Sequence, residues 1–149
     1  MSDVELNIPI GQIRMIPGGT SKHDALTMMI DAVSANPAVL DRDAFRRAVF
    51  EREAVMSTGI GNGVAVPHVR IAEVSVPTIG FGVAPDGIDF QALDNRPVYV
   101  VVLFATPLGA EKAYLSLMAK TMLILRNRNL FASLISCETP QQVHAVLNR

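Results

Sequence analysis

The chain has 149 residues, of which 50% are hydrophobic and 18% are charged, and its formal net charge is −1. A chain of this length is typical of one domain, and we expect residues 1–149 to form a single one. The balanced charge argues against a nucleic-acid partner. The longest interior apolar run, residues 98–105, is too short to insert directly into a membrane. Cys137 is the single cysteine, which favours a reducing, cytoplasmic location.

The N-terminal half predicts one edge strand and two helices. Weak alternation over residues 13–16 predicts the strand, which a Pro-Gly-Gly sequence ends. Ser21 followed by Asp24 is similar to a capping box, and apolar residues at helical spacing then predict a helix over residues 22–35. Asp41 is expected to cap a second helix, which carries Glu51-Arg52-Glu53 near its C-terminal end.

A glycine-rich run follows the second helix and leads to a histidine. Clustered backbone N–H groups in such a loop can form a concave site for an anion. Residues 64–66 predict a short buried strand that ends at Pro67, which places His68 at a strand end. The run therefore predicts a phosphate loop beside His68, formed by Thr58, Gly59, Gly61, Asn62 and Gly63.

The C-terminal half adds strands and helices in alternation. Residues 78–84 predict a strand, Asp86-Gly87 a turn, and residues 88–90 a short edge strand. The β-branched, apolar run at 98–105 predicts a central strand. Helices are predicted over residues 110–126 and 130–135. Thr139 is expected to cap a last helix with Pro140 at its first position. Interleaved strands and helices favour an α/β fold around one sheet.

His68 is the residue best suited to chemistry. A neutral imidazole is a nucleophile toward phosphorus, and with an ordinary pKa near ~6.5 most copies are neutral at pH 7. The planar cation of Arg52 could stabilise a phosphoryl group. From the residues alone, two structural alternatives stay open. His68 could bond a backbone carbonyl at a strand end, and Arg52 could complement the dipole of its helix. No His, Cys or carboxylate spacing suggests a metal site.

Familiar phosphate motifs do not fit the glycine run. A Walker loop requires Gly-Lys-Ser/Thr at its end, which this chain lacks. A dinucleotide-binding loop joins a strand to a helix, whereas here a predicted helix precedes the loop and a strand follows it.

The run from Arg52-Glu53 to Pro67-His68 closely resembles the enzyme IIA domain of the fructose/mannitol (nitrogen-regulatory-like) type, from the phosphoenolpyruvate-dependent sugar phosphotransferase system. The similarity continues through Leu93-Asp94 to Pro107 and covers most of the chain from Ser21 onward. It implies a three-layer α/β/α sandwich around one mixed β-sheet, and no metal or organic cofactor.

The resemblance also implies roles for residues and partners. His68 would accept a phosphoryl group from a histidine-containing phosphocarrier protein, and Arg52 would contact that group. The donor would dock on an apolar surface around His68. The chain would then be a phosphohistidine carrier, which passes the group to a sugar-specific transport component or uses it as a regulatory signal toward a protein target.

One position departs from this family. A second histidine followed by leucine is usual in the helix after the long strand, whereas this chain has Tyr114-Leu115. A tyrosine donates a hydrogen bond but is not an imidazole. An alternative is therefore a regulatory protein-binding module with the same fold and weak or no phosphotransfer.

Overall fold

The computed structural model describes residues 6–148. In chain order the elements are η1 (Ile10–Gln12), β1 (Ile13–Met15), α1 (Lys22–Ser34), α2 (Arg42–Val55), β2 (Gly59–Gly61), β3 (Val64–Ala65), β4 (His68–Arg70), β5 (Thr78–Ile88), β6 (Val98–Thr106), α3 (Glu111–Arg126), α4 (Arg128–Ile135) and α5 (Pro140–Leu147).

One mixed sheet forms the middle layer of the molecule. Its strand order is β1-β5-β6-β3-β2, and β4 also pairs with β6. β5 is antiparallel to β6, whereas β3 and β4 run parallel to it. The strand predicted over residues 98–105 is thus confirmed as central, and β1 lies at an edge as expected.

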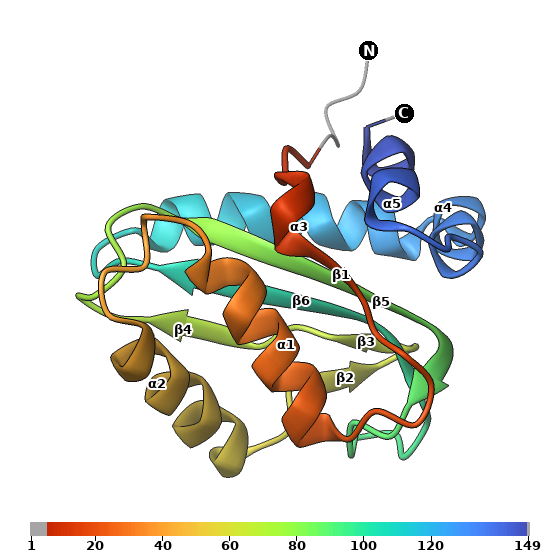
Figure 1. Ribbon diagram of the computed structural model, residues 1–149, viewed down its shortest axis with the longest axis horizontal. Helices are drawn as coiled ribbons and strands as arrows, with labels where there is room; N and C mark the ends of the chain where they lie inside the picture. The colour runs from red at the N-terminus through yellow and green to blue at the C-terminus, as the bar shows by residue number, and fades with distance from the viewer. Residues whose placement is uncertain (1–5, 149) are drawn as a thin grey trace.

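Helices cover both faces of this sheet. Figure 1 shows α1 and α2 on the near face, with α3, α4 and α5 on the far side. A buried cluster on the first side includes Leu26, Met29 and Phe45, and one on the second side includes Ile124 and Leu134. Full burial of such a side chain stabilises the fold by roughly 1.5–3 kcal/mol. The predicted three-layer α/β/α sandwich is confirmed.

The predicted helix starts are also confirmed. The side-chain oxygens of Ser21, Asp41 and Thr139 each accept a backbone N–H from the first turn of α1, α2 and α5. These contacts satisfy donors that have no partner within the helix. α4 begins at Arg128, two residues before the predicted start, because the Asn127 side chain caps it.

Three strand predictions need correction. The glycine run is a β-hairpin rather than a loop, with β2 and β3 joined by Asn62 and Gly63 at φ 58° and 80°. Positive φ at both positions is typical of a tight type I′ turn. β3 ends at Ala65, before Pro67, and His68 then begins a further strand, β4, which was not predicted. The separate strand at residues 88–90 is absent, because β5 continues through an irregularity to pair Ile88 with Val98.

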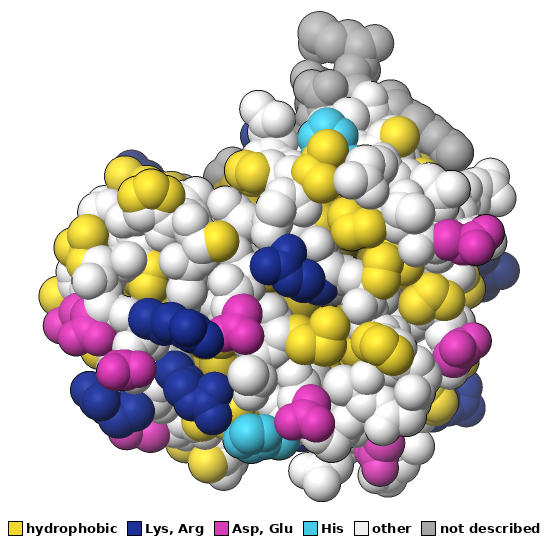
Figure 2. Space-filling view, in the orientation of Figure 1, with side chains coloured by type: hydrophobic (Ala, Val, Ile, Leu, Met, Phe, Trp, Pro, Cys, Tyr) yellow, Lys and Arg dark blue, Asp and Glu magenta, His cyan; other side chains and the backbone are white. Residues whose placement is uncertain are grey.

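The face formed by α1 and α2 carries charges of both signs. Figure 2 shows Lys and Arg side chains gathered over α2, with Asp and Glu side chains among them. Arg42 of α2, for example, pairs with Asp31 of α1. Over residues 6–148, none of the helices has the length and apolar character needed to cross a bilayer.

Candidate functional site

His68 lies beside the C-terminal end of the central strand. It is the first residue of β4 and pairs in register with Phe104 of β6. The carbonyl of Pro67 accepts a hydrogen bond from the backbone N–H of Phe104 at 2.9 Å, so the chain remains paired with β6 at the proline. β6 ends two residues later at Thr106, and the next helix is α3. The histidine is therefore held by the central, almost fully buried strand of the sheet.

Two side chains hold the half-buried imidazole. Nε2 of His68 lies 2.9 Å from Oγ1 of the fully buried Thr106. The ring of Tyr114, from the first turns of α3, stacks on the imidazole with 3.7 Å between centroids and 7° between planes. Phe104 in turn meets the Tyr114 ring edge-on at 5.6 Å. The imidazole is thus restricted both in its plane and across one face.

The surroundings of His68 favour its neutral form. Burial, followed by the positive charges of Arg70 and Arg52, lowers the pKa of His68 from 6.5 to about 4. Near pH 7 the ring therefore carries no positive charge and keeps a nitrogen lone pair. An uncharged imidazole beside two cations is well suited to receive an anionic group.

Arg52 reaches the same region from the last turn of α2. Its exposed guanidinium donates from Nη1 to the carbonyl of Met56 at 3.0 Å. Its charge also opposes the effect of burial, which raises the pKa of Tyr114 above 10.0. Within residues 6–148, no carboxylate forms an ion pair with Arg52. Arg52, His68 and Tyr114 were all singled out in the sequence. In the structure, Arg52 lies close enough to the other two for its charge to influence the pKa of both.

Sequence reasoning missed two residues of this site. Arg70 lies two positions after His68, and its Nη1 is 3.2 Å from Oε1 of Glu111 on α3. Thr106 precedes Pro107 at the end of the central strand. Alternation along β4 would have placed Arg70 on the same side of the strand as His68. The contact of Thr106 depends on the parallel register of β4 with β6, which no local pattern encodes.

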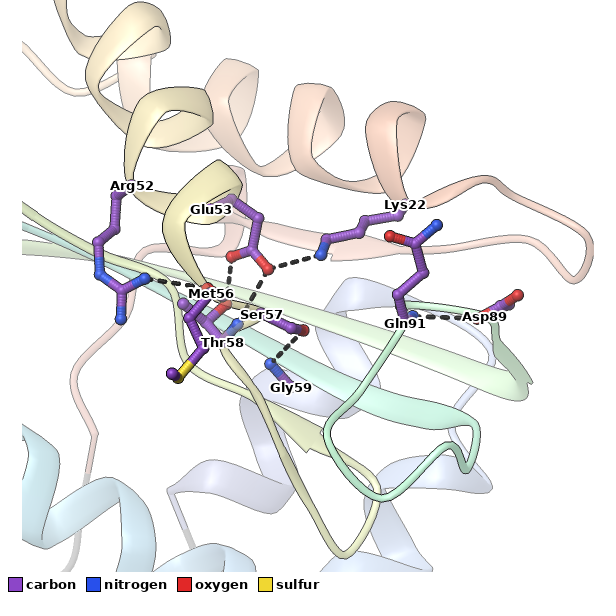
Figure 3. Close-up of polar contacts among 9 residues, drawn as sticks. All are labelled: Lys22, Arg52, Glu53, Met56, Ser57, Thr58, Gly59, Asp89 and Gln91. Carbon is purple, nitrogen blue, oxygen red and sulfur yellow. Dashed lines mark hydrogen bonds and ion pairs between the residues drawn. The ribbon is translucent and has the colours of Figure 1, made fainter.

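A buried ionic cluster fixes the end of α2 next to Arg52. Glu53 is 7% exposed, and its two carboxylate oxygens accept the backbone N–H of Thr58 at 2.9 Å and the Thr58 hydroxyl at 2.6 Å. Lys22 Nζ of α1 lies 2.7 Å from Oε2 of Glu53 (Figure 3). The cluster therefore joins the start of α1, the end of α2 and the start of the hairpin.

Glu53→Ala should lower the free energy of unfolding by about 3–5 kcal/mol, because it leaves the Lys22 ammonium and the Thr58 N–H without their buried partner. Urea denaturation monitored by circular dichroism measures this change. Glu51→Ala, at an exposed position of the same helix, is the matched control and should unfold close to wild type. Equal midpoints for Glu53→Ala and wild type would contradict a stabilising role of the cluster.

Three backbone N–H groups of the predicted phosphate loop already have partners within the protein. The N–H groups of Thr58, Gly59 and Asn62 donate to side chains of Glu53, Ser57 and Asp94. Gly61 pairs with β3.

The turn of the hairpin also lies far from His68. Gly63 is bonded to Tyr99, whereas His68 pairs with Phe104. Tyr99 and Phe104 are five residues apart along β6, which corresponds to roughly 16 Å. We therefore correct the prediction for Asn62 and Gly63, because they lie at the opposite end of the sheet from the imidazole.

The model of the phosphoenolpyruvate-dependent sugar phosphotransferase system, EIIA 2 family matches residues 8–149. The chain belongs to this family. It is also 29% identical over 147 residues to the fructose-specific EIIA component of Haloferax volcanii, covering 99% of this chain and 96% of that protein. Over 128 residues it is 30% identical to the fructose-specific EIIABC component of Bacillus subtilis, covering 86% of this chain and 20% of that protein. The chain thus spans about a fifth of the Bacillus protein.

A solved structure shows the same EIIA fold at similar length. The nitrogen regulatory protein IIA-Ntr from Neisseria meningitidis superposes with a TM-score of 0.82 and 25% sequence identity. The match covers 95% of this chain and 96% of that one. EIIA proteins related to this chain therefore include both fructose-specific components and nitrogen regulatory proteins.

Proposed function

We propose that this EIIA protein is a phosphoryl carrier and that His68 is the acceptor. The observation that carries the proposal is the neutral imidazole held between Thr106 and Tyr114 beside two arginines. In the transfer, a ring-nitrogen lone pair of His68 attacks the phosphorus of a donor phosphohistidine. The donor P–N bond breaks, and its electron pair returns to the donor imidazole. The group is held stoichiometrically and passed on, without a stand-alone turnover reaction.

Arg52 and Arg70 are the proposed charge partners of the phosphoryl group. A phosphoryl group adds close to two negative charges. Arg52 has no carboxylate partner among the described residues, and it can turn its planar fork toward phosphate oxygens. Arg70 pairs with Glu111 at an exposed position, and such surface pairs contribute little stability. Replacing the Glu111 carboxylate by a phosphoryl group as the partner of Arg70 therefore costs little free energy.

Exposed apolar side chains surround the elements that hold His68. Val55 and Met56, at the end of α2, are 81% and 57% exposed. Leu108 and Leu115, on either side of the start of α3, are 64% and 61% exposed. These residues form a docking rim suited to a histidine-containing phosphocarrier protein as donor. The acceptor would be a sugar-specific component or a regulatory protein, and the exchange would take place in the cytoplasm.

Tyr114 is the feature that favours the alternative of a binding module with little phosphotransfer. It covers one face of the imidazole with an aromatic ring whose hydroxyl is neutral at pH 7. Unlike a histidine, it provides no second imidazole for the phosphoryl group. Because a nitrogen lone pair lies in the plane of the imidazole ring, stacking on one face does not by itself block its attack on phosphorus.

Acid-labile phosphorylation tests the proposal against this alternative. The purified protein is incubated with phosphoenolpyruvate and the two general phosphotransferase proteins, and ³¹P NMR detects phosphohistidine. We expect stoichiometric labelling of wild type and a changed rate for Tyr114→His. Unlabelled wild-type protein, with labelling restored by Tyr114→His, would identify a binding module instead.

The low pKa of His68 should be visible in its NMR titration and in the pH dependence of the free energy of unfolding. In an NMR titration, the His68 ring protons should shift with a midpoint near 4 rather than near 6.5. Between these values the unfolded chain binds more protons at this residue than the folded protein, so the contribution of His68 to the free energy of unfolding rises with pH. His68→Gln should remove that contribution. A titration midpoint near 6.5 in wild type would contradict the described environment.

A further inference from the structure

A groove lies at the end of the sheet that is far from His68. It has a volume of about 680 Å³ and lies between the β2–β3 hairpin and the junction of α3 with α4. Its walls include Ile60 of β2, Leu125 of α3, and Phe131 and Ile135 of α4. Its volume falls within the range of pockets that hold small organic ligands, roughly 300–1,000 Å³.

The hairpin turn forms a fixed wall of this groove. A Cβ added to Gly63 would lie 3.3 Å from Cζ of Phe131 and 3.2 Å from Cδ2 of Tyr99, so the turn packs closely against both rings. The side chain of Ile60 projects from β2 and is 47% exposed. An aliphatic side chain at a groove wall, left partly in water, gains free energy when an apolar ligand covers it.

Two arginines supply the charge of the groove. Arg126 is the last residue of α3, Arg128 is the first residue of α4, and both line the groove. Among residues 6–148, neither guanidinium forms an ion pair. The nearby carboxylate of Asp94 accepts the N–H of Asn62 and does not line the groove. Two cations at the edge of an apolar groove complement a molecule with an anionic head and an apolar body.

We propose that this groove binds a small amphipathic carboxylate. Its apolar body packs against Leu125, Phe131 and Ile135, and its carboxylate is held by Arg126 and Arg128. Arginine forms paired, charge-assisted hydrogen bonds with carboxylates, which fixes the head group at the rim. The groove lies roughly 16 Å along β6 from His68, so binding there requires no phosphoryl transfer.

Octanoate and 1-octanol test this proposal, because they share an apolar chain and differ in charge. In ¹H–¹⁵N NMR titrations of the full chain, octanoate should shift signals of residues 60–64 and 125–135 saturably. Octanol should bind more weakly at the same place. The double variant Arg126→Gln/Arg128→Gln should lose about a hundredfold in octanoate affinity, since each charge-assisted bond accounts for about tenfold or more. Its octanol affinity should be unchanged.

Two further variants separate the groove from unspecific effects. Arg47→Gln removes an exposed arginine of α2 and should leave octanoate affinity unaltered. Ala132→Trp, at an exposed position that lines the groove, should block both ligands. The proposal is overturned if octanoate shifts the residues around His68 and Leu115 instead, if the double variant binds as wild type does, or if octanol binds as tightly as octanoate. Tight binding of an acidic peptide at the groove, with octanoate inert, would also overturn it.

Discussion

His68→Ala is expected to abolish acid-labile phosphorylation. The proposed transfer needs a neutral nitrogen nucleophile, and the alanine side chain provides none. His68→Gln is the better-folded companion variant, because its amide can still bond the buried Thr106 hydroxyl that faces Nε2 in wild type. Both variants should lack the phosphohistidine signal in ³¹P NMR under conditions that fully label wild type.

His23→Ala is the matched control for this experiment. His23 lies at the start of α1, with a side chain that is 64% exposed. Its substitution should leave labelling unchanged. If label persisted in both His68 variants and disappeared in His23→Ala, the acceptor would be His23 and our assignment of His68 would be wrong. Normal circular dichroism of each variant separates loss of the nucleophile from loss of the fold.

Arg52→Ala should slow labelling by about a hundredfold to a thousandfold, the usual effect of removing one donor that stabilises transition-state charge. The side chain is exposed and, within residues 6–148, bonds only the Met56 carbonyl, so the free energy of unfolding should change little. The pKa of His68 should also rise, because the charge of Arg52 is one cause of its low value. Stopped-flow or quench labelling and an NMR titration measure the two effects.

Two variants sharpen the interpretation of Arg52→Ala. Arg52→Lys keeps the charge but lacks the planar fork, so its labelling rate should lie between those of wild type and Arg52→Ala. Arg47→Ala removes a charge five residues earlier in the same helix and should label as wild type does. A wild-type rate for Arg52→Ala would exclude Arg52 as a partner of the phosphoryl group, even if its effect on the His68 pKa were observed.

Local signals explain why most of the fold was predictable. The caps Ser21, Asp41 and Thr139 and the apolar spacing after them act within a few residues, and the structure has helices where they predict them. The strand at 98–105 is apolar throughout because the sheet buries both of its faces. The prediction failed where glycine-rich sequence suits both a loop and a hairpin. The pairing of β2 with β3 and the bond from Leu93 to Gly59 decide between them.

By itself, then, the sequence determined the layers of this protein, its central strand and the histidine for which we propose a phosphotransfer role. The sequence singled out Arg52 and Tyr114, but only the tertiary structure decided how they and Thr106 surround that histidine. Thr106, Tyr114 and Arg52 come from the end of β6, the start of α3 and the end of α2. Their meeting depends on the register of β4 with β6 and on helix packing, which are set by contacts between distant segments. Such contacts leave no periodic pattern in the sequence, because each joins two side chains that lie far apart along the chain.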